Sequence, residues 1–323
     1  MTEARPNIMF KHFILTAALL ATFTLSSCGT DEPETSDAPS DNTEHPGTDP
    51  GAGGDTPGTG GEDPGSDEPR ENPITVNADG TTSTGAPFRR IDDTTFWLNY
   101  VKYHIVDGHI AVIGRDDTEI EHTLKGEVAL YSNITIDCVT YAVREIEVSA
   151  FSRCDALKVV HLPYGLTEIK GVVNDNRYDS GAFAYCKELT NVTFPNYLQT
   201  IGNDAFFGCT SITAVTFSTS LQTIGKQAFY KCTSLTSITF PNSLQSIGDE
   251  AFTSCASLTS VSFPNSLKTI GTGAFYNCTS LSSVIFPNSL QTIGNEAFYN
   301  CSSLKSVIFP NSLQTIGNEA FYN

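Results

Sequence analysis

Positive charge is scarce in this chain of 323 residues, which holds 18 Lys and Arg residues against 36 Asp and Glu residues. A protein that binds nucleic acid carries a basic stripe that neutralises phosphates. The sequence has no such stripe, and its formal net charge is −18 at pH 7. We therefore expect no nucleic-acid partner.

The sequence also lacks an apolar run long enough to span a membrane, which needs about 20 residues. The apolar stretch at residues 13–25 has 13 residues and follows a basic segment. A basic start with a short apolar core is typical of a secretory signal peptide. We predict that residues 1–27 are such a signal. Both Met1 and Met9 fit the pattern as its first residue.

Catalytic and cofactor-binding motifs are missing as well. The sequence contains no phosphate-binding loop and no dinucleotide fingerprint. His104, His109, His122 and His161 are scattered, and no nucleophile motif accompanies them. Solvated surface histidines explain this pattern best. We predict that the protein is not an enzyme and that it holds no cofactor and no metal.

A cysteine directly follows the predicted signal. The text Leu25-Ser26-Ser27-Cys28 resembles the bacterial lipobox, in which the cysteine becomes the first mature residue and carries lipid on its thiol and amino group. The alternative is an ordinary secretory signal with a chance cysteine. We predict that Cys28 is lipidated and attaches the protein to a membrane.

The segment after this cysteine is acidic and rich in proline and glycine. Residues 29–72 hold 7 Pro, 9 Gly and 13 acidic residues, but only two apolar residues. Such a segment cannot bury enough apolar surface to offset its chain entropy. We predict that residues 28–72 form the lipidated cysteine and a disordered tether. Asp31 and Glu32 resemble the export tag of surface-exposed lipoproteins in one Gram-negative phylum, which implies an exposed outer-membrane lipoprotein.

The strongest pattern is a cysteine every 23 residues, at Cys186, Cys209, Cys232, Cys255, Cys278 and Cys301. The surrounding text recurs with it, as in LTSITFPNSLQSIGDEAFTSC, residues 235–255. A fixed period of this length indicates that one supersecondary unit stacks repeatedly into a solenoid. One unit cannot bury its own apolar face, so the array is stable only as a series.

Each unit has a predictable course. The alternation Ile238-Thr239-Phe240 predicts a short strand, and Pro241-Asn242-Ser243 predicts a turn after it. A second extended piece follows, and Gly248 allows the next bend. We expect residues 248–252 to begin a short helical or 3₁₀ turn.

The repeated text Leu-x-x-Ile-x-Phe, closed by Ala-Phe-x-x-Cys, resembles the BspA-like leucine-rich repeats of Bacteroides-type surface lipoproteins, and the resemblance covers residues 146–323. It implies a β-rich leucine-rich-repeat solenoid and a role in adhesion. The place of the asparagine ladder in such repeats is held here by serine, at Ser243, Ser266, Ser289 and Ser312. Serine can still bond nearby backbone, although more weakly.

Residues 73–145 are out of register with the repeats. A hairpin about Asp107-Gly108 is predicted there, and we interpret the segment as a β-rich N-terminal cap over the first unit of the solenoid. At the other end, residues 310–323 duplicate residues 287–300, and the next repeat cysteine is due directly after Asn323. We expect that the sequence is a fragment of a longer array.

Three interpretations of the repeat cysteines are open. Stacked units bring their cysteines into the range for disulfides, and clustered cysteines can bind metal. However, each cysteine follows an Ala-Phe pair at an inward position, and free cysteine is among the most buried residue types. We favour a ladder of inert buried thiols.

Two outward rows are candidate binding surfaces. The strand row is polar and uncharged before it becomes apolar, and consists of Thr193, Thr216, Thr239, Ser262, Ile285 and Ile308. The aromatic row consists of Phe207, Tyr230, Tyr276, Tyr299 and Tyr322, with Thr253 interrupting it. Tyrosine ladders suit recognition of proteins or sugars. Self-stacking after recent duplication is the alternative that we favour for the rows, because neither carries distinctive charge.

These observations lead to one main functional hypothesis and several alternatives. The main hypothesis is a cell-surface lipoprotein whose solenoid binds proteins, including host matrix proteins, in the manner of an adhesin. The alternatives are glycan or nutrient capture, a structural role in the envelope, and an accessory to an enzyme. Sugar-binding platforms usually use tryptophan, and the single Trp97 lies outside the array, which favours protein partners.

Overall fold

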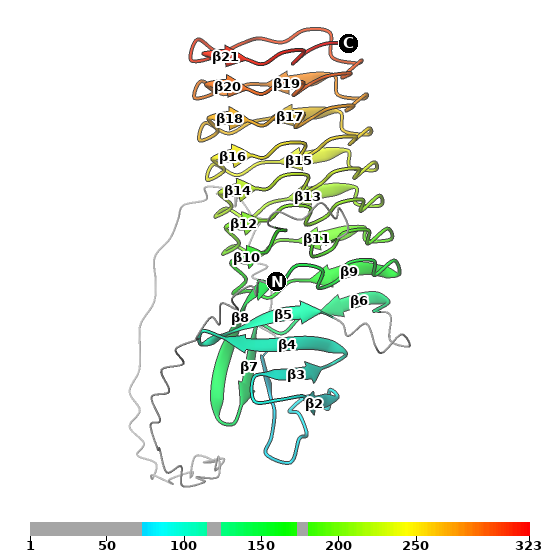
Figure 1. The fold of residues 1–323 in the computed structure, drawn as a ribbon, viewed down its shortest axis with the longest axis vertical. Helices are drawn as coiled ribbons and strands as arrows, with labels where there is room; N and C mark the ends of the chain where they lie inside the picture. The colour runs from blue at the N-terminus through cyan, green and yellow to red at the C-terminus, as the bar shows by residue number, and fades with distance from the viewer. Residues whose placement is uncertain (1–72, 115–123, 173–179) are drawn as a thin grey trace, which may run out of the picture. The chain divides into compact units, whose positions relative to one another are not determined.

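The fold is a stack of short β-strands above a small β-rich cap, as Figure 1 shows. The computed structural model describes residues 73–114, 124–172 and 180–323. Every regular element in these ranges is a strand. No helix in the described part of the chain is long and apolar enough to cross a membrane. The predicted signal peptide and tether, residues 1–72, lie outside the described residues.

The cap contains an antiparallel meander that runs from β2 through β5. The predicted hairpin is confirmed, because Asp107 and Gly108 join β4 to β5 with positive φ angles of 47° and 78°. Strand β8 then runs parallel to β5 and leads into the stack. The strands are β1 (Pro73–Thr75), β2 (Phe88–Arg90), β3 (Thr95–Leu98), β4 (Val101–Val106), β5 (His109–Gly114), β6 (Gly126–Ala129), β7 (Asn133–Ile136) and β8 (Val139–Ile146).

Each repeat unit contributes a longer and a shorter strand, as the strand and the second extended piece in the sequence predict. The longer strands are β9 (Leu157–His161), β11 (Asn191–Thr193), β13 (Ala214–Thr216), β15 (Ser237–Thr239), β17 (Ser260–Ser262) and β19 (Ser283–Ile285). The shorter strands are β10 (Glu168–Ile169), β12 (Thr200–Ile201), β14 (Thr223–Ile224), β16 (Ser246–Ile247), β18 (Thr269–Ile270), β20 (Thr292–Ile293) and β21 (Thr315–Ile316).

The strands of successive units pair in parallel and in strict register. The shorter strands continue from β8 through β21 in one sheet, and β6 heads a second sheet that continues through β9, β11, β13 and β15. Strands β17 and β19 form a separate pair. Residues 306–308, where the period predicts another three-residue strand, lie outside the assigned strands.

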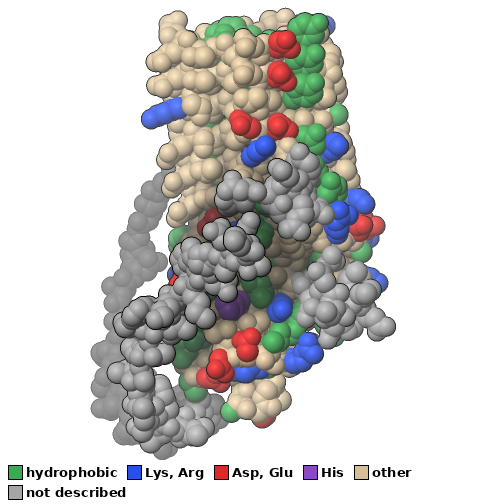
Figure 2. All heavy atoms as spheres, viewed as in Figure 1, with side chains coloured by type: hydrophobic (Ala, Val, Ile, Leu, Met, Phe, Trp, Pro, Cys, Tyr) green, Lys and Arg blue, Asp and Glu red, His purple; other side chains and the backbone are tan. Residues whose placement is uncertain are grey.

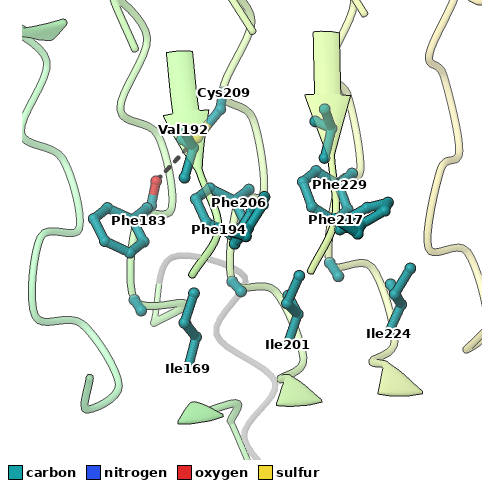
Figure 3. Close-up of a cluster of buried hydrophobic side chains, with 14 of the residues drawn as sticks. Ile169, Phe183, Val192, Phe194, Ile201, Phe206, Cys209, Phe217, Ile224 and Phe229 are labelled. Atoms are coloured by element: carbon teal, nitrogen blue, oxygen red, sulfur yellow. Dashed lines mark hydrogen bonds between the residues drawn. The ribbon is translucent and has the colours of Figure 1, made fainter. Parts of the chain in front are cut away.

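The core is built from ladders of identical side chains, because a strict period places the same residue at the same point of every unit. Phenylalanines from successive turns stack face to face with ring centroids 4.9 to 5.3 Å apart. A second phenylalanine row meets this stack edge-on, as Phe240 does against Phe252 at 5.8 Å and 71°. Figure 3 shows both rows with the isoleucines of the shorter strands on one side and Val192 of a longer strand on the other.

The helical or 3₁₀ turn predicted at residues 248–252 is wrong. The chain forms separate turns there, because Glu250 and Ser254 adopt left-handed backbone with φ of 55° and 61°. Their amides, and those of the equivalent residues, can then bond to the next unit. The amide of Lys231, the equivalent of Ser254, donates to the carbonyl of Thr253 at 2.8 Å. Bonding between units therefore overrides the local tendency to form a helix.

Gly248 has a different role from the bend that the sequence suggests, because it lacks a positive φ angle and instead allows two units to approach closely. A Cβ atom on Gly248 would lie 2.6 Å from the carbonyl carbon of Gly225. Real Cβ atoms essentially never show so short a contact, so a larger residue would push the units apart at this point. The glycine of every unit therefore keeps the stack tight.

Serine does bond to backbone at the place of the asparagine ladder. The Ser243 hydroxyl donates to the carbonyl of Leu221, in the preceding unit, at 2.6 Å. Ser266, Ser289 and Ser312 repeat this bond at 2.6 to 2.8 Å. Each of these hydroxyls therefore satisfies a carbonyl group in the neighbouring unit.

Candidate binding surface

The repeat cysteines offer no reactive site. All seven, from Cys154 to Cys301, are free and buried. The thiol of Cys209 donates to the carbonyl of Phe183 at 3.1 Å, and later cysteines repeat this bond. Burial raises the pKa of Cys209 to about 12, so the nucleophilic thiolate is scarce at neutral pH. The predicted ladder of buried free thiols is confirmed.

The histidines are held in separate polar contacts. His104 Nδ1 lies 3.1 Å from the Thr95 hydroxyl, and His161 Nε2 lies 2.6 Å from a Glu127 carboxylate oxygen. His122 lies outside the described residues. Among the described residues, no group of three or more His, Cys, Asp or Glu side chains is placed to hold a metal ion.

A small ionic cluster joins the cap to the first unit. Lys170 Nζ lies 2.7 Å from Glu145 and 2.8 Å from Glu147, and His109 Nε2 lies 3.4 Å from Glu145. Burial raises the pKa of Glu145, but the contacts with Lys170 and His109 outweigh it and hold that pKa below its usual value. The cluster contributes to the junction, and the sequence analysis did not identify it.

The strand row forms a continuous exposed surface. Thr193 pairs with Thr216, Thr216 pairs with Thr239, and Ser262 pairs with Ile285. All of these side chains are exposed. In each three-residue strand the central residue is buried and the residues on either side of it are exposed. Ile308 lies beyond the strands but is 88% exposed. The predicted register of this row is therefore confirmed from β11 to β15 and from β17 to β19.

A shallow hollow of about 310 Å³ lies on this surface between β15 and β17. Its lining includes Thr239 and Ser262 from the strand row, and Asn242 and Asn265 from the turns that follow. The two strands belong to different sheets. The hollow is thus lined by hydroxyl and amide groups together with apolar side chains such as Phe240 and Phe263. It contains no titratable side chain, so it can bind but has no group for acid–base catalysis.

The aromatic row stacks on itself, as the favoured alternative predicts. Phe207 and Tyr230 stack at 4.7 Å, and Tyr276 stacks on Tyr299 at 4.8 Å. Tyr299 then stacks on Tyr322 at 5.2 Å. Thr253 interrupts the row, so two separate runs of stacked rings lie on the surface. The sequence analysis missed Tyr185, which meets Phe207 at 5.3 Å from one position off the register.

A further row was not identified from the sequence. It runs beside the aromatic row, and every member has a positive φ angle. We call it the left-handed row, and its members are Asp204, Gln227, Glu250, Gly273, Glu296 and Glu319. Figure 2 shows acidic side chains beside a column of hydrophobic side chains near the C-terminal end of the stack. The 23-residue spacing of these residues was a signal that could have revealed the row.

Parallel ladders, a 23-residue period and rows of stacked phenylalanine define a leucine-rich-repeat solenoid. The family model described as BspA type leucine rich repeat region matches residues 126–173, 176–285 and 222–323. The chain belongs to this BspA-type leucine-rich-repeat family.

Solved structures of bacterial leucine-rich-repeat proteins resemble the chain. A T. pallidum leucine-rich-repeat protein is 28% identical with a TM-score of 0.45, and the match covers 68% of this chain and 83% of that one. A leucine-rich cell surface protein from Faecalibacterium prausnitzii A2-165 is 24% identical with a TM-score of 0.48, and the match covers 71% of this chain and 52% of that one. The comparison with curated proteins returned no match.

Proposed function

We propose that the protein is a cell-surface lipoprotein of the outer membrane that uses its solenoid as a scaffold for binding proteins, in the manner of an adhesin. Lipid on Cys28 would anchor it, and the acidic segment 29–72 would hold the solenoid away from the membrane. A disordered tether of these 44 residues, as the sequence predicts, would span on the order of 35 Å and let the solenoid reach partners beyond the headgroups.

One observation carries this proposal, namely the flat and uncharged strand row. Five strands from β11 to β19 present hydroxyl or apolar side chains outward, and their backbones are fixed by bonds between units and by the phenylalanine ladders. A rigid surface binds at a lower entropic cost than one that must become ordered. The row therefore suits an extended contact with another macromolecule.

The C-terminal part of the row supports a protein as the partner. Ile285 and Ile308 are 62% and 88% exposed. A cluster of large exposed apolar side chains marks interaction sites in soluble proteins. Sugars would meet this part of the row poorly, because it offers few hydrogen-bonding groups.

A binding screen with the full chain tests the proposal. Matrix proteins and glycans are arrayed separately, and each variant is compared with the parent. Thr216→Arg and Ile285→Asp place charges on the strand row and should abolish binding of a protein partner. Gln222→Arg and Gln245→Asp, on exposed residues that follow the turns, serve as matched controls and should bind normally.

Other outcomes would refute the proposal in specific ways. Binding to glycans alone would favour glycan or nutrient capture, and binding to neither class would favour a structural role in the envelope. Mass spectrometry of the mature N-terminus tests the anchor independently. A free N-terminus other than Cys28 would contradict lipidation.

A further inference from the structure

The aromatic row contains a gap the size of one side chain. Thr253 occupies the register position that lies between Tyr230 and Tyr276, and it is too short to stack on either ring. Its hydroxyl donates to the carbonyl of Gly273 at 2.6 Å. The polar group of Thr253 is therefore satisfied internally, and the space that a ring would fill stays empty.

The left-handed row loses a side chain at the neighbouring position. Gly273 replaces the acidic residue found one unit before and one unit after, at Glu250 and Glu296. A Cβ atom on Gly273 would lie 3.3 Å from Glu250 Cγ and 3.9 Å from the Thr253 hydroxyl oxygen. A longer side chain at this point would enter the gap, so two small residues together keep it open.

These two replacements produce a cleft of about 220 Å³, which we call the ring slot. Tyr rings line it at both ends, the two small residues are buried at its base, and two carboxylates stand beside it. Its lining includes Tyr230, Tyr276, Thr253, Gly273, Glu250 and Glu296. Of the two carboxylates, that of Glu296 is exposed, so a ligand can approach it from solvent.

The slot matches the thickness of one planar group. Parallel units repeat at about 4.8 Å, so the two tyrosines that line the slot, two units apart, are separated by roughly 9.5 Å. A planar group placed midway would lie at about 4.8 Å from each ring. Tyr276 already stacks on Tyr299 at 4.8 Å, so the inserted group would reproduce the spacing of the existing row.

The charge around the slot favours a cation. Glu250 and Glu296 supply two carboxylates, and the faces of aromatic rings attract cations. The row already holds two cations of its own chain, because the Arg153 guanidinium carbon lies 5.1 Å from the centre of Tyr185 and Lys231 Nζ lies 5.4 Å from the centre of Tyr230. A cation on a ring is therefore an established contact in this row.

We propose that the ring slot binds the guanidinium group of an arginine side chain on a protein partner. Guanidinium is both planar and cationic, and it stacks on aromatic rings while donating to carboxylates. A neutral ring would gain nothing from the carboxylates, and a compact ammonium would not fill a planar gap. This inference rests on the proposed protein-binding function, since the arginine reaches the slot as part of a partner.

A titration of the full chain with acetyl-arginine amide tests the slot. The tyrosine rings are labelled with ¹³C, and the ring signals of Tyr276 should shift in a saturable way. Acetyl-citrulline amide is planar but uncharged, and acetyl-lysine amide is charged but not planar. We expect each to bind at least threefold more weakly than the arginine probe. Either control probe binding as tightly as the arginine probe, or no shift with arginine, would overturn the assignment.

Two variants that close the slot provide the structural test. Thr253→Tyr restores the ring that the neighbouring units carry, and Gly273→Gln restores the side chain that Gln227 already has in the same left-handed conformation. Both should abolish the arginine shift while thermal unfolding stays unchanged or improves. Gln245→Tyr, on an exposed residue outside both rows, is the control and should bind the arginine probe normally. Retained binding in both closing variants would refute the slot.

Two further variants test the charge. Glu296→Gln should weaken arginine binding roughly threefold, as removal of an exposed ion pair does, and Lys231→Gln should strengthen it because a competing cation is removed. Stronger arginine binding by Glu296→Gln together with weaker binding by Lys231→Gln would refute the proposal that the slot binds a cation. The outcome is separable from the proposed function: a slot that binds arginine in a protein that captures no partner refutes the function, and capture without any arginine shift refutes the slot.

Discussion

Replacement of Asp204 by asparagine should stabilise the protein at neutral pH. Only 7% of Asp204 is exposed, and its Oδ1 atom has no hydrogen-bond partner among the described residues. Burial raises its pKa to about 6, Lys226 opposes the rise, and Glu250 adds to it. A carboxylate in this place is costly once it is ionised.

The magnitude follows from the difference between the two pKa values. The pKa of this carboxyl group is 3.8 in the absence of structure and about 6 in the fold, and each unit is equivalent to about 1.4 kcal/mol. The unfolded chain releases the proton first, so folding stability falls as pH rises from about 4 to about 6. The full loss is at most about 3 kcal/mol, and almost no loss remains below about pH 3 because both states are then protonated.

Asp204→Asn removes this titration. Asparagine tolerates the left-handed backbone at this position, where φ is 57°. Urea unfolding followed by circular dichroism should show the variant to be more stable than the parent by about 1 to 3 kcal/mol at pH 7.5 and equal to it at about pH 3. Asp107→Asn, at an exposed turn, is the control. A gain that persists in full at about pH 3, or a loss at pH 7.5, would refute this account of the burial cost.

Three further predictions concern the stack and its junction. All seven repeat cysteines should resist alkylation in the folded protein and react once it is unfolded, and peptide mapping would expose any that is disulfide-bonded. Ser243→Ala should cost about 1 kcal/mol in urea unfolding, whereas Ser260→Ala, on an exposed side chain, should cost nothing measurable. Lys170→Met should lower the melting temperature at pH 7 and have less effect below pH 4, because protonation of Glu145 then removes the charge that the lysine neutralises. An equal effect at both pH values would contradict the ionic role of Lys170.

The architecture could be predicted from the sequence because the period places similar residues at the same position of each unit, so the same strands and turns recur. Ile247 and Phe252 recur in unit after unit, so an error in one unit would have been visible in the others. The hairpin at Asp107-Gly108 followed from turn chemistry alone. The register of Thr216 with Thr239 followed from the period, since parallel pairing of equal units leaves no other register.

The left-handed turns and the ring slot could not be predicted from the residues of a single unit. The segment at Glu250 has a sequence that suits a helical turn, but bonding between units selects left-handed backbone there. The slot depends on two small residues, Thr253 and Gly273, which are 20 positions apart in sequence and become neighbours only when units stack. The partner of Lys170 could not be predicted either, because it depends on how the cap meets the first unit.

The backbone bonds between units run in both directions along the stack. The amide of Gly225 donates to Ile201 in the preceding unit, whereas the amide of Phe229 donates to Ala251 in the following unit. In an α-helix all such dipoles point the same way and sum to a charge at each end. In this solenoid the bonds toward the preceding unit and those toward the following unit have opposite dipoles, which offset one another. The dipole of the stack therefore does not grow as units are added. Repeat number can therefore change by duplication, as in residues 287–300 and 310–323, without altering the field at the ends of the solenoid.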